Sequence, residues 1–230
     1  IKKVDFKSNP LSFLTSSGKI FTADSVIIST GASAKWLGLK SEKKYTGHGV
    51  SACATCDAFF FKNKTVAVVG GGNTAVEEAI FLSKFAKKVL LIHRRDKLRA
   101  EKVLQNRLFN NNKIEIIWNN VVNDIYGEDE PKKVNSISLT NINNNKITKL
   151  EIDGIFIAIG HKPNTEIFSQ VLNLDKEGYI ITKDQIFTNV KGVFAAGDVH
   201  DKSYRQAVTA AGFGCMAALE AEKYLSSIEK

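Results

Sequence analysis

Apolar runs separated by glycine turns set out the predicted elements of the central part of the chain. Residues 65–69 are apolar and predict a strand, and a glycine turn follows them. Residues 74–85 then have the pattern of a helix, and residues 88–92 predict a second strand, apolar from Val89 onward. This succession is the beginning of a βαβ unit, which predicts a parallel sheet.

The remaining pattern predicts further strands and one long helix. Three buried strands are expected to end at glycine turns, which suits strand ends that face a ligand; they lie within residues 25–33, 153–164 and 192–198. A polar segment at 106–112 precedes a strand at 114–118, and 141–145 forms a hairpin-like turn. An alanine-rich stretch at 204–226 predicts a closely packed helix.

This order of elements predicts two domains of the α/β class. The central domain spans residues 34–162 and is inserted into a second domain made of residues 1–33 and 163–230. We predict that both are Rossmann-like, three-layer, nucleotide-binding domains.

Charge and hydropathy argue against a nucleic-acid-binding protein and against a membrane-spanning one. The net charge of +8 comes from lysines and arginines that are scattered along the chain, which favours a solvated surface over a nucleic-acid site. No apolar run reaches the roughly 20 residues of a membrane-spanning helix, so we expect a cytoplasmic protein. The chain begins with Ile1, and no nucleotide-binding glycine loop precedes residue 33, which suggests a fragment.

A glycine loop follows the strand at 65–69 and fits the dinucleotide fingerprint. Gly70 permits a tight turn, Gly72 lets the backbone approach a pyrophosphate, and Ala75 lets the helix pack closely on the sheet. Asn73 and Thr74 open the helix, whose N-terminal amides face the phosphates. A structural turn is the alternative, but the flanking strand and helix favour nucleotide binding.

Arginines occupy the end of the next strand, where an enzyme that prefers NAD usually carries Asp or Glu. The segment begins at His93 and offers Arg94, Arg95 and Arg99 as permanently charged donors to a 2′-phosphate. The sequence therefore predicts that the cofactor is NADPH. The alternative is that these arginines are only a solvated run of charges after a strand.

Two of the three cysteines are separated by two residues. The spacing of Cys53 and Cys56 lets their sulfurs close and reopen a small disulfide, which suits two-electron exchange. Half of a zinc site is the alternative, but no second cysteine pair or histidine cluster supplies the other ligands, and we expect no metal. The third, Cys215, lies in the predicted small-residue helix.

An aspartate and three phenylalanines follow the cysteine pair. Asp57 is placed to relay protons to a departing thiolate, or equally to cap a turn on the surface. Phe59, Phe60 and Phe61 follow, and we expect at least one in the core and the others on an exposed docking face.

Four motifs together resemble the low-molecular-weight thioredoxin reductases. They are GVSACATCD at 49–57, GGGNTAVEEA at 70–79, HRRDxxRA at 93–100, and AAGDV at 195–199 followed by YRQA at 204–207. All stand in the order seen in that family, and the similarity runs over essentially the whole chain. The resemblance implies a thioredoxin-disulfide reductase that passes electrons from NADPH through FAD and a redox disulfide to thioredoxin.

The resemblance also implies a role for each domain. The disulfide belongs to the NADPH domain at 34–162, with Cys56 facing the flavin, Cys53 attacking thioredoxin, and Asp57 acting as acid and base. Phe59 and Phe60 match the family's partner-docking aromatics. The flanking segments would hold FAD through Thr30, Gly31, Ala32, Gly197, Asp198, Val199, Arg205, Gln206 and Ala207. A homodimer is implied as well.

The chain departs from the family in two places. Ala58 stands where glycine is common, and the family's opening strand, glycine loop and helix for the FAD pyrophosphate have no counterpart. The second departure keeps a catalytically incomplete NADP-binding fragment as an alternative. Reductases of other acceptors are a further alternative, but ferredoxin reductases lack the cysteine pair, and the flavoprotein of alkyl hydroperoxide reductase lacks the three arginines.

Overall fold

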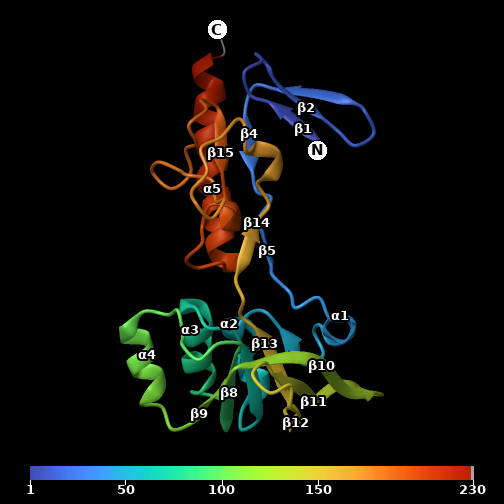
Figure 1. Ribbon diagram of the computed structural model, residues 1–230. Helices are drawn as coiled ribbons and strands as arrows, with labels where there is room; N and C mark the ends of the chain where they lie inside the picture. The colour runs from blue at the N-terminus through green and yellow to red at the C-terminus, as the bar shows by residue number, and fades with distance from the viewer. Residues whose placement is uncertain (229–230) are drawn as a thin grey trace. The chain divides into compact units, whose positions relative to one another are not determined.

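The computed structural model describes residues 1–228 and separates the chain into two compact units (Figure 1). The central unit comprises residues 34–160, and the flanking unit comprises residues 1–33 with the chain from residue 161 onward. The chain passes from the flanking unit to the central unit between residues 33 and 34, and returns between residues 160 and 161, slightly before the predicted boundary at 162. Gly160 ends the central unit with φ of +101°, and strand β14 begins at the next residue.

A parallel sheet forms the middle layer of the central unit. The order of its strands is β6-β13-β7-β8-β9, and every neighbouring pair is parallel. The strands predicted from the apolar runs at 65–69, 88–92, 114–118 and within 153–164 are confirmed. Their bounds are β6 (Val50–Ser51), β7 (Thr65–Val69), β8 (Lys88–His93), β9 (Ile114–Trp118) and β13 (Gly154–Ile157).

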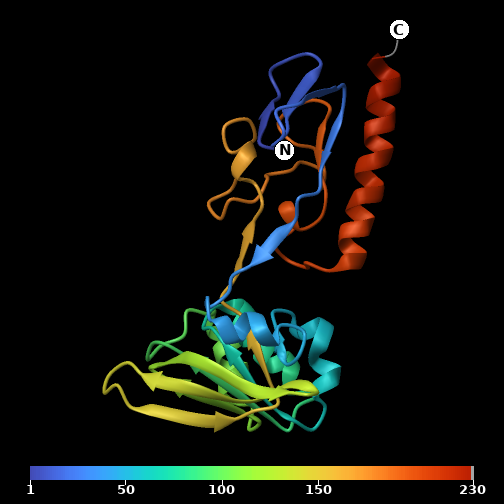
Figure 2. The same cartoon turned by 90° about the vertical axis from the view of Figure 1, so that its right-hand side faces the viewer.

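Helices cover one face of this sheet and a second sheet covers the other (Figures 1 and 2). The helical side buries the apolar face of α3 (Asn73–Leu82), and α4 (Lys102–Phe109) contributes Leu108 to the same core. The sequence did not predict α4, because its residues 106–109 belong to a polar segment and Leu108 alone is buried. The opposite side is antiparallel: β10 (Asn120–Asp129), β11 (Lys132–Asn141) and β12 (Ile147–Glu151).

Short elements lead into the central unit and toward its first cysteine. Glu42, in α1 (Lys40–Tyr45), is buried and accepts hydrogen bonds from the backbone N–H groups of Leu37 and Gly38 at 2.8 and 3.0 Å. These bonds hold the entering chain against α1. After β6 come α2 (Ala54–Asp57) and the 3₁₀ turn η1 (Ala58–Phe61).

The flanking unit has a smaller parallel sheet made of β4 (Val26–Ile28) and β15 (Val193–Ala195). The predicted helix at 204–226 is confirmed as α5 (Ala207–Ile228), which buries Ala217 and Ala221 against Phe194. The other elements are β1 (Lys3–Asp5), β2 (Leu11–Leu14), β3 (Ile20–Ala23), β5 (Ala32–Ala34), β14 (His161–Pro163), η2 (Glu166–Phe168) and η3 (Gly197–Val199).

Candidate active site

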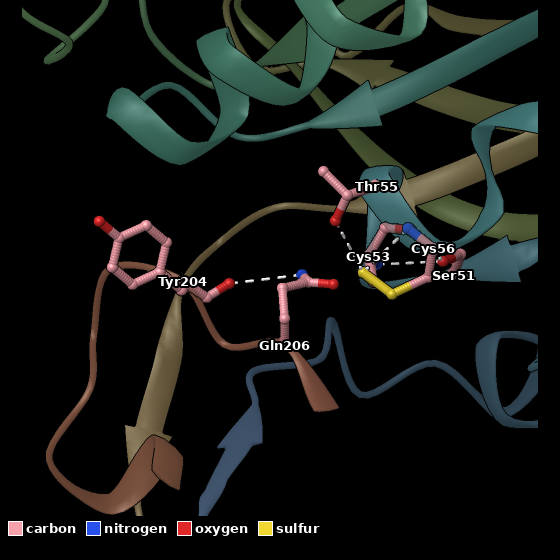
Figure 3. Close-up of a disulfide and its surroundings, with 6 residues drawn as sticks. All are labelled: Ser51, Cys53, Thr55, Cys56, Tyr204 and Gln206. Carbon is pink, nitrogen blue, oxygen red and sulfur yellow. Dashed lines mark hydrogen bonds between the residues drawn. A yellow bond between two sulfur atoms is a disulfide. The ribbon is translucent and has the colours of Figure 1, made fainter. Parts of the chain in front are cut away.

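Cys53 and Cys56 form a disulfide with a Cα–Cα distance of 5.3 Å (Figure 3). The backbone N–H of Cys53 donates to the hydroxyl of Ser51 at 3.0 Å. The sulfur of Cys53 accepts a hydrogen bond from the backbone N–H of Cys56 at 3.2 Å, and the Thr55 hydroxyl lies 3.3 Å from the same sulfur. These contacts favour a thiolate on Cys53 once the disulfide is reduced.

Residues next to the disulfide in α2 and η1 pack into the hydrophobic core of the central unit. Ala54 and Ala58 are almost fully buried, and Phe61 packs edge-on against Phe156 with a centroid distance of 5.3 Å. Phe61 is therefore the core member of the phenylalanine run, as expected. Phe59 and Phe60 are each 70% exposed, so the turn presents two aromatic rings to solvent beside the disulfide.

The two sulfurs are bonded to each other, so they are not the zinc ligands that the alternative required. Among residues 1–228, no group of three or more His, Cys, Asp or Glu side chains is arranged to hold a metal ion. The remaining cysteine, Cys215, is free and exposed on α5.

A cavity of about 560 Å³ opens at the carboxyl ends of β7, β8 and β13. This is the edge of a parallel sheet where nucleotides commonly bind. Gly70 has a φ of +156°, and a methyl group added to Gly71 would lie 2.2 Å from the His93 ring. A methyl group at Gly72 would meet nothing within 4 Å, so the backbone there is open to a ligand.

Two of the three predicted arginines line this cavity. Arg94 and Arg99 are exposed at its wall, whereas Arg95 is exposed but does not line it. The backbone N–H of Arg99 donates to the carbonyl of Gly71 at 2.7 Å, which holds the arginine loop against the glycine loop. In the described part of the chain, residues 1–228, no acidic side chain lines the cavity, so its charge suits a phosphorylated ligand.

The other residues predicted from the nucleotide fingerprint lie in different places. Thr74 and His93 line the cavity, whereas Ala75 is fully buried beneath the loop. Asn73 is engaged elsewhere: its side-chain oxygen accepts from the backbone N–H of Glu101 at 2.8 Å, and its amide donates to the Glu101 carboxylate at 3.2 Å. Asn73 thus ties helix α3 to the end of the arginine loop.

A separate cavity of about 460 Å³ lies within the flanking unit. The predicted flavin positions that line it are Gly31, Gly197, Asp198, Arg205, Gln206 and Ala207. Thr30, Ala32 and Val199 do not. Thr30 instead donates through its hydroxyl to the carbonyl of Asn164 at 2.8 Å, and Val199 is fully buried in the core.

Comparison with known proteins identifies the family. Residues 1–214 match the pyridine nucleotide-disulphide oxidoreductase family. The thioredoxin reductase of Rickettsia conorii is 56% identical over 227 residues, which cover 98% of this chain and 73% of that protein. The thioredoxin reductase of Coxiella burnetii is 52% identical, with 100% of this chain and 73% of that protein covered.

A solved structure agrees with these sequences. The crystal structure of thioredoxin reductase from Streptococcus pyogenes superposes with a TM-score of 0.93 at 43% identity, covering 99% of this chain and 73% of that one. The chain belongs to the thioredoxin reductases of the pyridine nucleotide-disulphide oxidoreductase family. Members are NADPH-dependent oxidoreductases that use FAD and reduce the disulfide of thioredoxin.

The residues present in each cavity fit the family's cofactors. The cavity of the central unit combines an open glycine backbone with the guanidinium groups of Arg94 and Arg99, which suits NADPH. The cavity of the flanking unit offers the carboxylate of Asp198 as an acceptor for hydroxyls and the Arg205 side chain as a donor, which suits part of a flavin.

Several lining residues were not predicted from the sequence. Ile159 and Gly160 line the cavity of the central unit just after β13, and the rule that ligands bind at strand ends could have indicated them. Asn120 and Val122 line it from β10, and no local signal marks them, because β10 belongs to the second sheet. In the flanking unit the unpredicted lining residues are Ile27, Ser29, Ala196, Ala210 and Gly214.

Burial raises the pKa of Asp198 above its ordinary value of 3.8, and the neighbouring Asp201 carboxylate adds to the rise, while Arg205 opposes it. A raised pKa means that the folded state binds the proton more tightly than the unfolded state does. The contribution of Asp198 to stability is therefore full below pH 3.8 and is lost as pH rises through the folded-state pKa.

Replacement of Asp198 by asparagine is expected to raise the free energy of unfolding at neutral pH, because it removes a partly desolvated charge. The gain should shrink as pH falls toward 3.8, where the native carboxyl also becomes neutral. Urea unfolding across this pH range measures the change in the free energy of unfolding. The matched control is Asp24→Asn, at an exposed position of the same unit. A gain of equal size at all pH values would contradict the assignment.

Within residues 1–228, no helix combines the length and the apolar character that crossing a bilayer requires.

Proposed function

We propose that Cys53 and Cys56 are the redox pair through which this chain reduces thioredoxin, and that the cavity of the central unit binds NADPH. One observation carries the proposal: the disulfide follows β6, the glycine loop follows β7 and the arginines follow β8, all at one edge of a parallel sheet. Ligands bind at this edge in open α/β sheets.

The two cysteines take different roles in the proposal. Cys53 is the nucleophile toward thioredoxin, because the Cys56 N–H and the Thr55 hydroxyl lie at its sulfur and stabilise a thiolate. Cys56 is the sulfur that receives electrons from the flavin. Asp57, whose backbone N–H donates to the carbonyl of Cys53 at 3.2 Å, supplies and accepts the protons of the exchange.

The cofactor roles follow from the same residues. Gly70, Gly72 and Thr74 hold the phosphates of NADPH beside the N-terminus of α3, and Arg94 and Arg99 bind the 2′-phosphate. The flanking unit holds FAD through the residues of its own cavity, with Asp198 toward the ribityl chain and Arg205 near the isoalloxazine. FAD held there would supply the two-electron chemistry that links NADPH to the disulfide.

The exposed rings of Phe59 and Phe60 are proposed to dock thioredoxin. Aromatic side chains beside a reactive group are typical anchors of a protein interface. The family resemblance further supports a homodimer in the cytoplasm.

The proposal predicts a fixed stoichiometry. With FAD and oxidised thioredoxin present, each NADPH consumed should yield one reduced thioredoxin disulfide, since both changes involve two electrons. NADPH consumption is followed by its absorbance and thioredoxin thiols by titration. NADPH consumption without reduced thioredoxin, or without dependence on thioredoxin, would overturn the proposal.

A further inference from the structure

A cavity of about 340 Å³ adjoins the disulfide segment. One wall comes from that segment and includes Ser51, Asp57 and Phe60. The other includes three lysines: Lys64, Lys132 and Lys133. We call this cavity the basic groove. Because Phe60 is at once a wall of the groove and an exposed ring beside the disulfide, a protein that docks on Phe60 also meets the groove.

The position of the lysines is set by backbone contacts. The N–H of Val134 donates to the carbonyl of His48 at 3.1 Å, which joins the β10–β11 hairpin to the segment that leads to Cys53. A methyl group at Gly127 would lie 2.1 Å from the carbonyl oxygen of Lys133, so the two strands approach closely there. The hairpin therefore holds Lys132 and Lys133 at a defined place beside the disulfide segment.

Each lysine of the groove has an internal neighbour that falls short of an ion pair: Lys64 lies over the Phe61 ring at 5.7 Å, and Lys132 and Lys133 stand opposite Asp129 and Glu128 across β10 and β11. Among residues 1–228, none of Lys64, Lys132 and Lys133 forms an ion pair, and Asp129, on the same hairpin, pairs instead with Lys44 at 2.7 Å. Lys132 and Lys133 are exposed.

The acidic residues of the groove do not cancel these charges. Asp57 and Asp153 also line it, but both are half-buried, and the Asp153 carboxylate accepts the backbone N–H of Thr65 at 2.9 Å. His48, at the rim, is exposed. The lining of the groove holds three lysines and two carboxylates, so its net charge is positive, which raises the encounter rate with a negatively charged surface.

We propose that the basic groove receives acidic side chains of the protein substrate, and that this contact speeds the encounter that brings the substrate's disulfide to Cys53. The inference rests on the proposed function, since it needs Cys53 to react with thioredoxin. It adds that the matching thioredoxin carries carboxylates on the surface that flanks its disulfide.

The test follows a single thiol exchange that needs no cofactor. In a Cys56→Ser, Cys215→Ser background, Cys53 is the only cysteine. Its thiolate attacks a single-cysteine thioredoxin carried as a pyridyl mixed disulfide. A sulfur–sulfur bond forms between Cys53 and thioredoxin, the bond to the pyridyl sulfur breaks, and pyridinethione is released after taking a proton. The same background reacted with dithiodipyridine, an uncharged small disulfide, reports the reactivity of Cys53 itself.

Two variants with equal changes of charge make the comparison. Lys132→Gln with Lys133→Gln lowers the charge by two beside the groove, and Lys146→Glu lowers it by two in the turn between β11 and β12, at the other end of β11. We expect the double variant to lower the ratio of the thioredoxin rate constant to the dithiodipyridine rate constant about tenfold at low ionic strength. Lys146→Glu should leave this ratio unchanged, and high salt should close the gap.

The outcomes separate the two proposals. If Cys53 reacts with dithiodipyridine but forms no mixed disulfide with thioredoxin, the proposed function fails. If the mixed disulfide forms but the double variant matches Lys146→Glu, or the rate is independent of salt, the role of the basic groove is overturned.

Discussion

Replacement of Cys53 by serine is expected to lower NADPH-dependent thioredoxin reduction more than roughly a thousandfold, because removal of a nucleophile abolishes the covalent step. The hydroxyl of serine cannot form a disulfide. The measurement is the steady-state rate of NADPH oxidation with FAD and oxidised thioredoxin present.

Cys56→Ser provides the informative comparison. It should abolish turnover to the same extent, since the redox pair is broken, but it should still trap thioredoxin through Cys53 as a mixed disulfide visible on a non-reducing gel. Cys53→Ser should trap none. Cys215→Ser, at the free cysteine of α5, is the control that retains activity. Trapping by Cys53→Ser rather than by Cys56→Ser would reverse the proposed roles.

Removal of both cavity arginines is expected to abolish the preference for NADPH over NADH. A hydrogen bond to a charged group contributes about 1.5–3 kcal/mol, which corresponds to roughly 10- to 100-fold in affinity for each arginine. Arg94→Ala with Arg99→Ala should therefore weaken NADPH binding at least about a hundredfold and leave NADH binding nearly unchanged. Quenching or enhancement of nicotinamide fluorescence on titration measures both dissociation constants without flavin.

Arg95 offers the matched control for this prediction. It lies in the same loop and is equally exposed, but it does not line the cavity. Arg95→Ala should weaken NADPH binding far less than the double variant does. If the double variant lost as much affinity for NADH as for NADPH, these side chains would not recognise the 2′-phosphate. The same would follow if Arg95→Ala weakened NADPH binding as much as the double variant does.

The local parts of the central unit were predictable because each rests on a short pattern. β7 (Thr65–Val69) is apolar from Val66 to Val69 and is followed by Gly70, and its predicted bounds match the structure. Helix α3 begins within one residue of its expected start and ends at Leu82, earlier than the predicted 85. Helix α4 was missed, since an amphipathic helix that buries one leucine leaves little apolar signal.

The candidate site was predictable to a similar depth. The cysteine spacing indicated a disulfide, which the structure contains. The glycine and arginine motifs indicated a nucleotide cavity, and Arg94 and Arg99 line it. The distinction between these two arginines and Arg95 was not predictable, because it depends on which way each side chain of a surface loop is directed.

The sequence by itself determined the main strands of the parallel sheet, helices α3 and α5, the spacing of Cys53 and Cys56 that suits a redox disulfide, and the family, because local spacing along the chain encodes them. Only the tertiary structure decided that the β10–β11 hairpin brings Lys132 and Lys133 beside the disulfide segment, and that Asn120 and Val122 line the nucleotide cavity. The physical reason is that β10, β11 and β12 form a separate sheet that packs on the parallel sheet, where the N–H of Val134 donates to the carbonyl of His48. Such pairings depend on packing between distant segments, and no local pattern of residues records them.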